Sequence, residues 1–134
     1  MELKIVHTDK APGAVGPYSQ AVLAGNILFL SGQIPINPAT GELVKSSIEE
    51  ETRQCLENAK AILEEAGTTL ENVIKATVFI KDMDQFGRIN EVYGQYFHTH
   101  YLMRRSNVKH PKCQPLVHKV LQFCPLFYSK ALAP

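Results

Sequence analysis

A change in the spacing of apolar residues halfway along the chain constrains the fold more than any other feature. Residues 48–66 carry apolar side chains at the period of an α-helix that buries one face. A few positions later, residues 73–81 alternate in the manner of a strand whose two faces differ. The two patterns predict a helix followed closely by a strand.

The ends of this helix are marked in the sequence. Ser47 stands three residues before Glu50, which is the spacing of a capping box. Glu49 and Glu51 also fall in the first turn, where the helix dipole favours negative charge. Gly67 follows the last apolar position and predicts the C-terminal cap.

The N-terminal third is predicted to form strands. Residues 3–7, 18–23 and 26–33 are short runs rich in aliphatic and aromatic side chains. Gly25 and Asn26 fit the two-residue turn of a hairpin between the second and third of these runs.

Further along, Asp82 or Asp84 is expected to cap a second helix with an apolar face in residues 86–97. Residues 116–123 fit a strand or a helix. The order β-β-β-α-β-α predicts an α+β domain with both helices on one face of a mixed sheet. The other face of the sheet then needs a partner, which self-association would supply.

Length and composition narrow the class of protein. A chain of 134 residues predicts a single domain over residues 1–134. No apolar run approaches the ~20 residues of a membrane helix, and the first residues carry no secretory signal pattern. Three cysteines, an odd number, argue against a disulfide scaffold, so a cytoplasmic location is expected.

Charge divides the chain into two parts. Residues 1–97 hold all 13 acidic and 8 basic groups, a sum of −5, whereas residues 98–134 hold 6 basic groups and no acid, a sum of +6. The sequence lacks a phosphate-binding glycine loop, a dinucleotide fingerprint, a zincin helix and a Gly-x-Ser-x-Gly elbow. These absences favour a binding protein or a small-substrate enzyme over a nucleotide enzyme.

Two strings carry most of the functional information. Residues 11–21 read Ala-Pro-Gly-Ala-Val-Gly-Pro-Tyr-Ser-Gln-Ala, and residues 30–35 read Leu-Ser-Gly-Gln-Ile-Pro. Taken alone they fit a stiff loop and a strand end equally well. Both strings resemble the RidA (L-PSP) family, and the resemblance continues almost without gaps over residues 4–97.

The resemblance implies both a fold and an activity. The implied fold is a chorismate-mutase-like α+β domain, β-β-β-α-β-α-β, that forms a homotrimer with clefts between subunits. The implied activity is hydrolysis of reactive imines and enamines, such as 2-iminobutanoate and 2-iminopropanoate, to 2-keto acids and ammonia. No metal and no cofactor is expected, and the expected partners are the imino acid and two further copies of the chain.

The resemblance also implies an arginine that holds the substrate carboxylate, since a guanidinium binds a carboxylate through two hydrogen bonds. The Arg-Ser-x-Val string selects Arg105, whereas counting from Phe97 selects Arg104. Asn107 lies inside the same string and is expected to contact substrate. Without the resemblance, two adjacent arginines indicate a solvated basic face.

Four other positions correspond to pocket residues of the family. Tyr18 is expected to orient the attacking water, and Ser31 and Gly32 to line the cleft at a strand end. Asn90 corresponds to a pocket-side residue of the second helix. Without the resemblance these would be a loop tyrosine, a tight turn and a surface asparagine.

The C-terminal part departs from the family. No acidic residue follows Glu91, so the glutamate that family members place near the end is absent. Three explanations stand: a change of reading frame near residue 98, a divergent tail that has abandoned the chemistry, or His118 acting as the base. The coding DNA tests the first of these.

The same tail allows two other interpretations. His98, His100, His110 and Cys113 have ligand-like spacing and could form a zinc site with Cys124. Paired cysteine knuckles are missing, however, and no metal site is predicted. A basic tail also fits an RNA-binding protein or an L-PSP-type endoribonuclease, because lysine and arginine neutralise phosphates. An inactive scaffold with the family fold is the remaining alternative.

Overall fold

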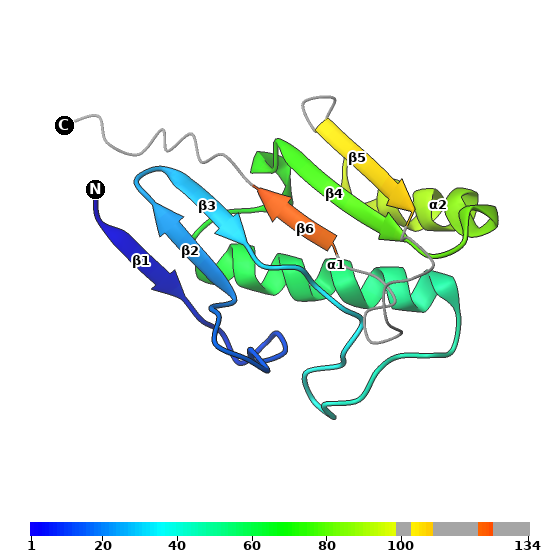
Figure 1. The fold of residues 1–134 in the computed structure, drawn as a ribbon, viewed down its shortest axis with the longest axis horizontal. Coiled ribbons are helices and arrows are strands. Elements are labelled where there is room, and N and C mark those ends of the chain that lie inside the picture. Colours follow the sequence, from blue (N-terminus) through cyan, green and yellow to red (C-terminus); the bar gives the residue numbers. More distant parts are fainter. Residues whose placement is uncertain (99–102, 109–120, 125–134) are drawn as a thin grey trace.

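The computed structural model describes residues 1–98, 103–108 and 121–124 (Figure 1). The strands are β1 (Leu3–Val6), β2 (Ala21–Ala24), β3 (Ile27–Leu30), β4 (Lys75–Ile80), β5 (Met103–Val108) and β6 (Leu121–Cys124). The helices are α1 (Ile48–Glu65) and α2 (Phe86–Tyr96), with short 3-10 turns at Leu70–Asn72 and Met83–Gln85. The predicted α+β class is confirmed.

The first sheet is an antiparallel meander in the order β1-β2-β3. Its hairpin turns at Gly25, which has a φ of 62°, followed by Asn26 with negative φ. A positive φ at the first central residue is the geometry of a type II′ turn, for which glycine is the preferred residue. The predicted hairpin is therefore confirmed.

Helix α1 has the predicted caps. Ser47 Oγ accepts a hydrogen bond from the Glu50 N–H at 3.2 Å. At the other end, the Gly67 N–H donates to the Glu64 carbonyl at 3.0 Å and the Thr68 N–H donates to the Leu63 carbonyl at 2.9 Å. This pair of bonds is a Schellman motif, and Gly67 occupies its left-handed position with a φ of 83°.

The second sheet differs from the expectation. Its order is β5-β4-β6, with β4 parallel to β5 and antiparallel to β6. Two strands therefore follow α2 where one was expected, and the expected single sheet is two three-stranded sheets that are neighbours at β3 and β6. Strand β5 was missed because its sequence, Met-Arg-Arg-Ser-Asn-Val, is mostly polar and shows no apolar alternation.

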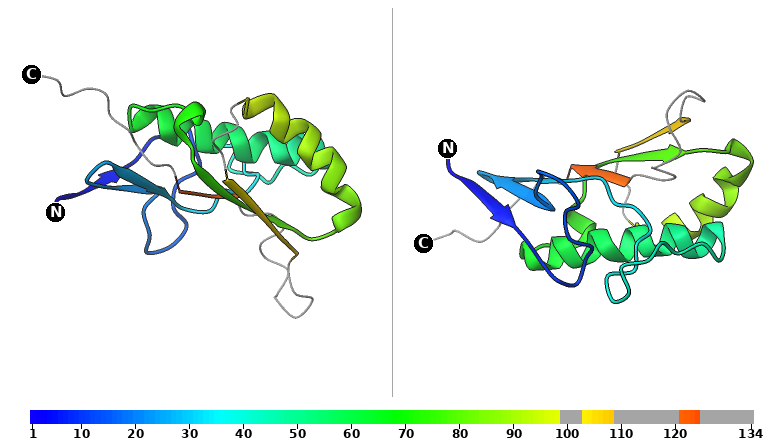
Figure 2. Two further views of the ribbon diagram at one scale, coloured as in Figure 1. Left: turned by 90° about the horizontal axis from the view of Figure 1, so that it is seen from above. Right: turned by 60° about the horizontal axis from the view of Figure 1, so that its bottom comes forward.

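Both helices cover one face of the strands, as Figure 2 shows in two views. The even-numbered side chains of β4 are buried on this side, in agreement with the predicted alternation. The core is aliphatic, and its fully buried large side chains include Leu28, Leu56, Ile62, Leu63 and Ile80.

The opposite face of the first sheet is apolar and uncovered. Leu3, Ile5 and Phe29 are 64%, 68% and 49% exposed. The register pairs Ile5 with Val22 and Val22 with Phe29, so these side chains form one row across the three strands. We refer to Leu3, Ile5, Val22 and Phe29 as the open face.

Some expected strand bounds were wrong. Strand β2 begins at Ala21 instead of Tyr18, and β3 ends at Leu30 instead of Gln33. Residues 17–20 and 31–33 form loops whose backbone groups bond to side chains, as described below. In the expected element 116–123, the described part, from Leu121, belongs to a strand beside β4; residues 116–120 lie outside the described residues.

Polar contacts join the outer sides of the two helices. Arg88 donates from Nη2 to Glu49 Oε2 at 2.8 Å and from Nε to Oε1. This guanidinium lowers the pKa of Glu49. Tyr96 Oη donates to Glu57 Oε1 at 2.6 Å. Within the described residues, no helix has both the length and the apolar character to cross a membrane.

Candidate functional site

Three of the residues expected to contact substrate meet at one cavity. Tyr18, Ser31 and Gly32 line a cavity of about 30 Å³ between the loop before β2 and the segment after β3. Among the residues that the structure describes, its other walls are Pro12, Gly13, Val15, Gln20, Gln33, Ile34 and Ile36. The volume suffices for ordered water but does not enclose a four-carbon acid.

A tight turn presents Tyr18 to this cavity. The Tyr18 N–H donates to the Gly16 carbonyl at 2.8 Å, which makes a three-residue turn centred on Pro17. The proline ring fixes the negative φ that this turn requires. The Val15 N–H donates to Tyr18 Oη at 3.3 Å, so the phenol accepts from the backbone and keeps its own proton for donation. The side chain is 51% exposed.

Ser31 is fixed on three sides. Its N–H donates to the Gln20 carbonyl at 3.0 Å, and its Oγ donates to the Ser19 carbonyl at 2.6 Å. Its own carbonyl accepts from Gln33 Nε2 at 2.9 Å. Because the hydroxyl proton is directed at Ser19, Ser31 Oγ can serve the cavity only as an acceptor.

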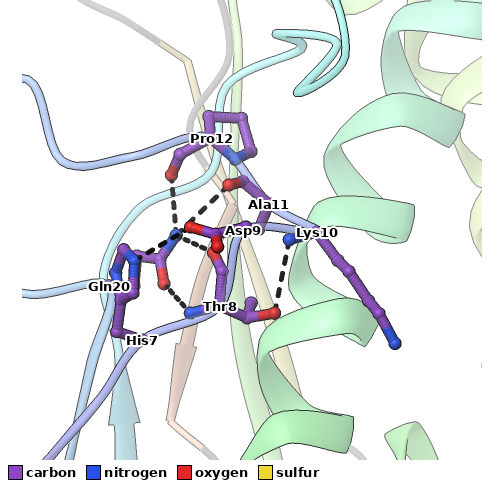
Figure 3. Close-up of polar contacts among 7 residues, drawn as sticks. All are labelled: His7, Thr8, Asp9, Lys10, Ala11, Pro12 and Gln20. Atoms are coloured by element: carbon purple, nitrogen blue, oxygen red, sulfur yellow. Dashed lines mark hydrogen bonds and ion pairs between the residues drawn. The ribbon is translucent and has the colours of Figure 1, made fainter.

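The side chain of Gln20 holds one wall of the cavity (Figure 3). Gln20 is buried, and its Oε1 accepts from the Thr8 N–H at 2.7 Å. Its Nε2 donates to the carbonyls of Thr8 at 3.0 Å, Ala11 at 3.3 Å and Pro12 at 2.9 Å. Residues 8–12 thus make hydrogen bonds to this side chain where a strand would make them to a neighbouring strand.

A second buried amide holds the facing wall. Asn58 of α1 is 1% exposed, and its Nδ2 donates to the carbonyls of Ile34 at 3.2 Å and Ile36 at 2.9 Å. Its Oδ1 accepts from Gln54 Nε2 at 2.8 Å. Sequence reasoning missed Gln20 and Asn58. The available signals were the place of Gln20 in the Pro-Tyr-Ser-Gln string and a polar residue inside the apolar stripe of α1.

The two candidate arginines are neighbours on β5, so their positions belong to opposite faces of the sheet. Arg105 is paired with Thr77, and Arg104 is paired with Ala76. Ala76 is fully buried on the helix-covered face, whereas Thr77 is half-buried on the other face. Paired positions in a sheet share a face, so the Arg105 position belongs with the face away from the helices. The Asn107 position, two residues further along, belongs to the same face of the sheet as the Arg105 position.

Among the predicted site residues whose side chains the structure describes, Asn90 is the one that lies away from the cavity. It is half-buried on α2 and is not among the residues that line the cavity of Tyr18 and Ser31. The predicted site residues of one chain are therefore divided between the cavity, β5 and α2.

No acidic side chain lines this cavity, although every Asp and Glu of the chain lies in its described part. His118, which one of the three explanations makes the base, lies outside the described residues, as do His100, His110 and Cys113. Among the residues that the structure describes, no three His, Cys, Asp or Glu side chains converge as metal ligands would.

A larger cavity of about 490 Å³ lies elsewhere, between the loop before α1 and the end of β4. Lys45, Lys81, Glu51 and Asp82 contribute two charges of each sign to its lining. Tyr18, Ser31, Gly32 and Asn90, the predicted site residues whose side chains the structure describes, do not line it. Because these positive and negative side chains are equal in number, their charges favour neither an anionic nor a cationic ligand.

Comparison with known proteins identifies close relatives. Residues 8–118 match the model of the family described as Endoribonuclease L-PSP. A RutC family protein of Pyrococcus horikoshii is 58% identical over 94 residues, which are 70% of this chain and 75% of that protein.

Two solved structures are similar over most of the chain. Escherichia coli TdcF with bound serine is 40% identical with a TM-score of 0.81, covering 92% of this chain and 98% of that one. RidA from an Antarctic Psychrobacter bacterium is 35% identical with a TM-score of 0.83, covering 92% and 99%.

Proposed function

The chain belongs to the Endoribonuclease L-PSP family, which includes the RidA proteins, and on that basis we propose that it deaminates reactive 2-imino acids. The proposed substrates are 2-iminobutanoate and 2-iminopropanoate, and the products are the 2-keto acids and ammonia. The observation that carries the proposal is the cavity where Tyr18, Ser31 and Gly32 meet.

The ligand of a relative supports a substrate of this size and charge. TdcF was crystallised with serine, a three-carbon acid with nitrogen on the carbon next to the carboxylate. A 2-imino acid has the same arrangement of carboxylate and nitrogen, with a planar carbon between them. The site of a relative that accepts serine thus fits the proposed class of substrate.

The reaction needs little beyond positioning. The water oxygen attacks the iminium carbon, and the electron pair of the C=N bond moves to nitrogen. One proton of that water passes to the nitrogen, which becomes an ammonium leaving group. The C–N bond breaks with its electron pair going to nitrogen, the carbon–oxygen double bond forms, and the remaining hydroxyl proton passes to the departing ammonia, which leaves as ammonium. Because the iminium carbon is already electrophilic, a held water and a fixed carboxylate account for the acceleration.

Tyr18 and Ser31 supply complementary groups for these steps. The Tyr18 hydroxyl accepts from the Val15 N–H and can donate its proton to the attacking water, which fixes one lone pair of that water. Ser31 Oγ, which donates to Ser19, accepts a hydrogen bond from the substrate nitrogen. The cavity thus separates a donor for the water from an acceptor for the iminium N–H groups.

The sheet register supports Arg105 over Arg104 as the carboxylate ligand. The Arg105 position shares a face with Thr77, away from the helices, whereas the Arg104 position shares the buried face of Ala76. A charged group on the helix-covered face would lose its hydration without gaining access to a substrate.

We further propose that the active unit is a homotrimer with its sites between subunits. The cavity of one chain is too small for the substrate, and Asn90 lies apart from it. The open face offers Leu3, Ile5 and Phe29 for burial against a neighbouring copy. A neighbour seated there would complete the walls of the site.

A coupled assay tests the activity. The protein is incubated with a threonine dehydratase and threonine, and release of 2-ketobutanoate is followed; the expected result is faster release than with the dehydratase alone. Arg105→Ala should greatly reduce the acceleration, whereas Arg53→Ala, on the outer side of α1, should retain it. No acceleration by the wild type, together with RNA cleavage that survives repurification, would favour the endoribonuclease alternative.

A further inference from the structure

We propose that Gln20 is a positioning residue that fixes the wall of the substrate cavity, an inference that rests on the function proposed above. It is 4% exposed and makes four hydrogen bonds to the backbone of residues 8–12. Figure 3 shows its amide between Thr8 and Pro12, with all four bonds directed at backbone atoms.

The loop depends on these bonds because its backbone has no strand partner. The carbonyls of Thr8, Ala11 and Pro12 all face the single Nε2 of Gln20, at 3.0, 3.3 and 2.9 Å. Buried carbonyls without a donor are destabilising, and here the three carbonyls share the two N–H groups of Nε2. The amide thereby sets the path of the chain into Pro12, which is a wall of the cavity.

The same residue also connects the loop to the reacting groups. Its backbone carbonyl accepts from the Ser31 N–H at 3.0 Å, and it follows Tyr18 by two positions. Tyr18 in turn depends on the loop, because its Oη accepts from the Val15 N–H. Val15 follows Pro12 by three positions, so a shift of residues 8–12 that extends to Val15 would move the phenol relative to Ser31.

Two substitutions separate the donor role of the amide from its shape. Gln20→Glu keeps the acceptor for the Thr8 N–H but places carboxylate oxygen against the three carbonyls. Gln20→Met keeps a similar length and removes both hydrogen-bonding functions. Gln95→Glu makes the same chemical change on the exposed side of α2, where the side chain accepts from Arg53 at 3.1 Å, and serves as the control.

The pH profile gives a readout that a loss of packing would not produce. In Gln20→Glu the introduced carboxyl is buried among carbonyls, which raises its pKa, and its protonated form regains one donor. His7, Asp9 and Lys10 are the exposed titratable groups of the adjoining loop, and they are unchanged in all variants. Gln20→Met therefore reports any contribution from them.

The expected result is a loss of roughly 10- to 100-fold in kcat/KM for both variants at pH 8, since small misplacements of reacting groups carry penalties of that order. The loss in Gln20→Glu should shrink as the pH falls to 5.5, whereas that in Gln20→Met should not. Gln95→Glu should match the wild type throughout. Gln20→Glu activity within twofold of the wild type at pH 8 would overturn the proposal.

Amide hydrogen exchange keeps this test independent of the reaction. The Thr8 amide should exchange faster in Gln20→Met, which lacks its acceptor, than in the wild type or Gln20→Glu. Unchanged Thr8 exchange in Gln20→Met would overturn the role of Gln20 even if activity fell. A wild type without deaminase activity would refute the proposed function, and Thr8 exchange would then decide whether Gln20 holds the wall.

Discussion

The substitution Ile5→Glu on the open face tests the proposed assembly most directly. Fully burying an aliphatic or aromatic side chain contributes ~1.5–3 kcal/mol. Scaled by the exposed fractions of 64%, 68% and 49%, burial of Leu3, Ile5 and Phe29 contributes about 3–5 kcal/mol per chain. Replacing Ile5 removes about 1–2 kcal/mol of this, and desolvating an unpaired carboxylate costs several kcal/mol more.

The loss per chain thus approaches the whole contribution of the open face, so the variant should dissociate. Sedimentation velocity measures this directly: the wild type should sediment as three copies of the 15.0 kDa chain, about 45 kDa, and Ile5→Glu as a monomer. The circular dichroism of the variant should match the wild type, because Ile5 is exposed in the single chain and outside its core.

Met83→Glu provides the matched control. Met83 is also an exposed apolar residue, 47% accessible, but it lies in a 3-10 turn outside the open face. This variant should remain a trimer. A monomeric wild type, or an Ile5→Glu variant that stays trimeric, would refute the reasoning that the open face is where copies meet.

Three further predictions concern single groups. Arg105→Ala should lower kcat/KM by roughly 10- to 150-fold in the coupled assay, which is the loss expected for one hydrogen bond to a charged group. Arg104→Ala should cause a smaller loss. If Arg104→Ala causes the larger loss, Arg104 is the carboxylate ligand. Gly67→Ala should lower the melting temperature by roughly 3 °C in calorimetry, because an alanine at a φ of 83° costs about 1 kcal/mol; an unchanged value would contradict that strain. Burial, and then the hydrogen bond to Glu57, raise the pKa of Tyr96 to about 12. This raised pKa contributes stability to the folded state below the ordinary tyrosine pKa, and that contribution is lost as the pH rises through about 12. Ultraviolet titration should lose one phenol step near pH 12 in Tyr96→Phe and show that step at lower pH in Glu57→Gln.

Much of the framework was predictable because its signals are local. The apolar stripe of α1, its cap at Ser47 and its end at Gly67 all lie within one continuous segment. The alternation in β4 and the turn at Gly25 are likewise set by neighbours along the chain. Period and cap residues report backbone geometry directly, so these elements were found to within a few residues.

Part of the candidate site was predictable. Its residues were found from the sequence strings that resemble the family, and the spacing of apolar residues did not indicate them. Tyr18, Ser31 and Gly32 meet as expected, although they come from two segments. The side-chain amides of Gln20 and Asn58 were missed, because no local sequence pattern indicates that a glutamine or asparagine is buried and hydrogen-bonded to a distant segment. Gln20 bonds to the N–H of Thr8, twelve positions earlier, and Asn58 bonds to the carbonyl of Ile34, twenty-four positions earlier.

The sequence by itself thus determined the two helices, the first four strands and the strings that resemble the family. Only the tertiary structure decided that the polar segment Met103–Val108 is a strand, since its hydrogen bonds are made to β4. The same pairing decided which of Arg104 and Arg105 shares the face away from the helices. The physical reason is that register and buried amide contacts join residues far apart in the chain, and no local period encodes them.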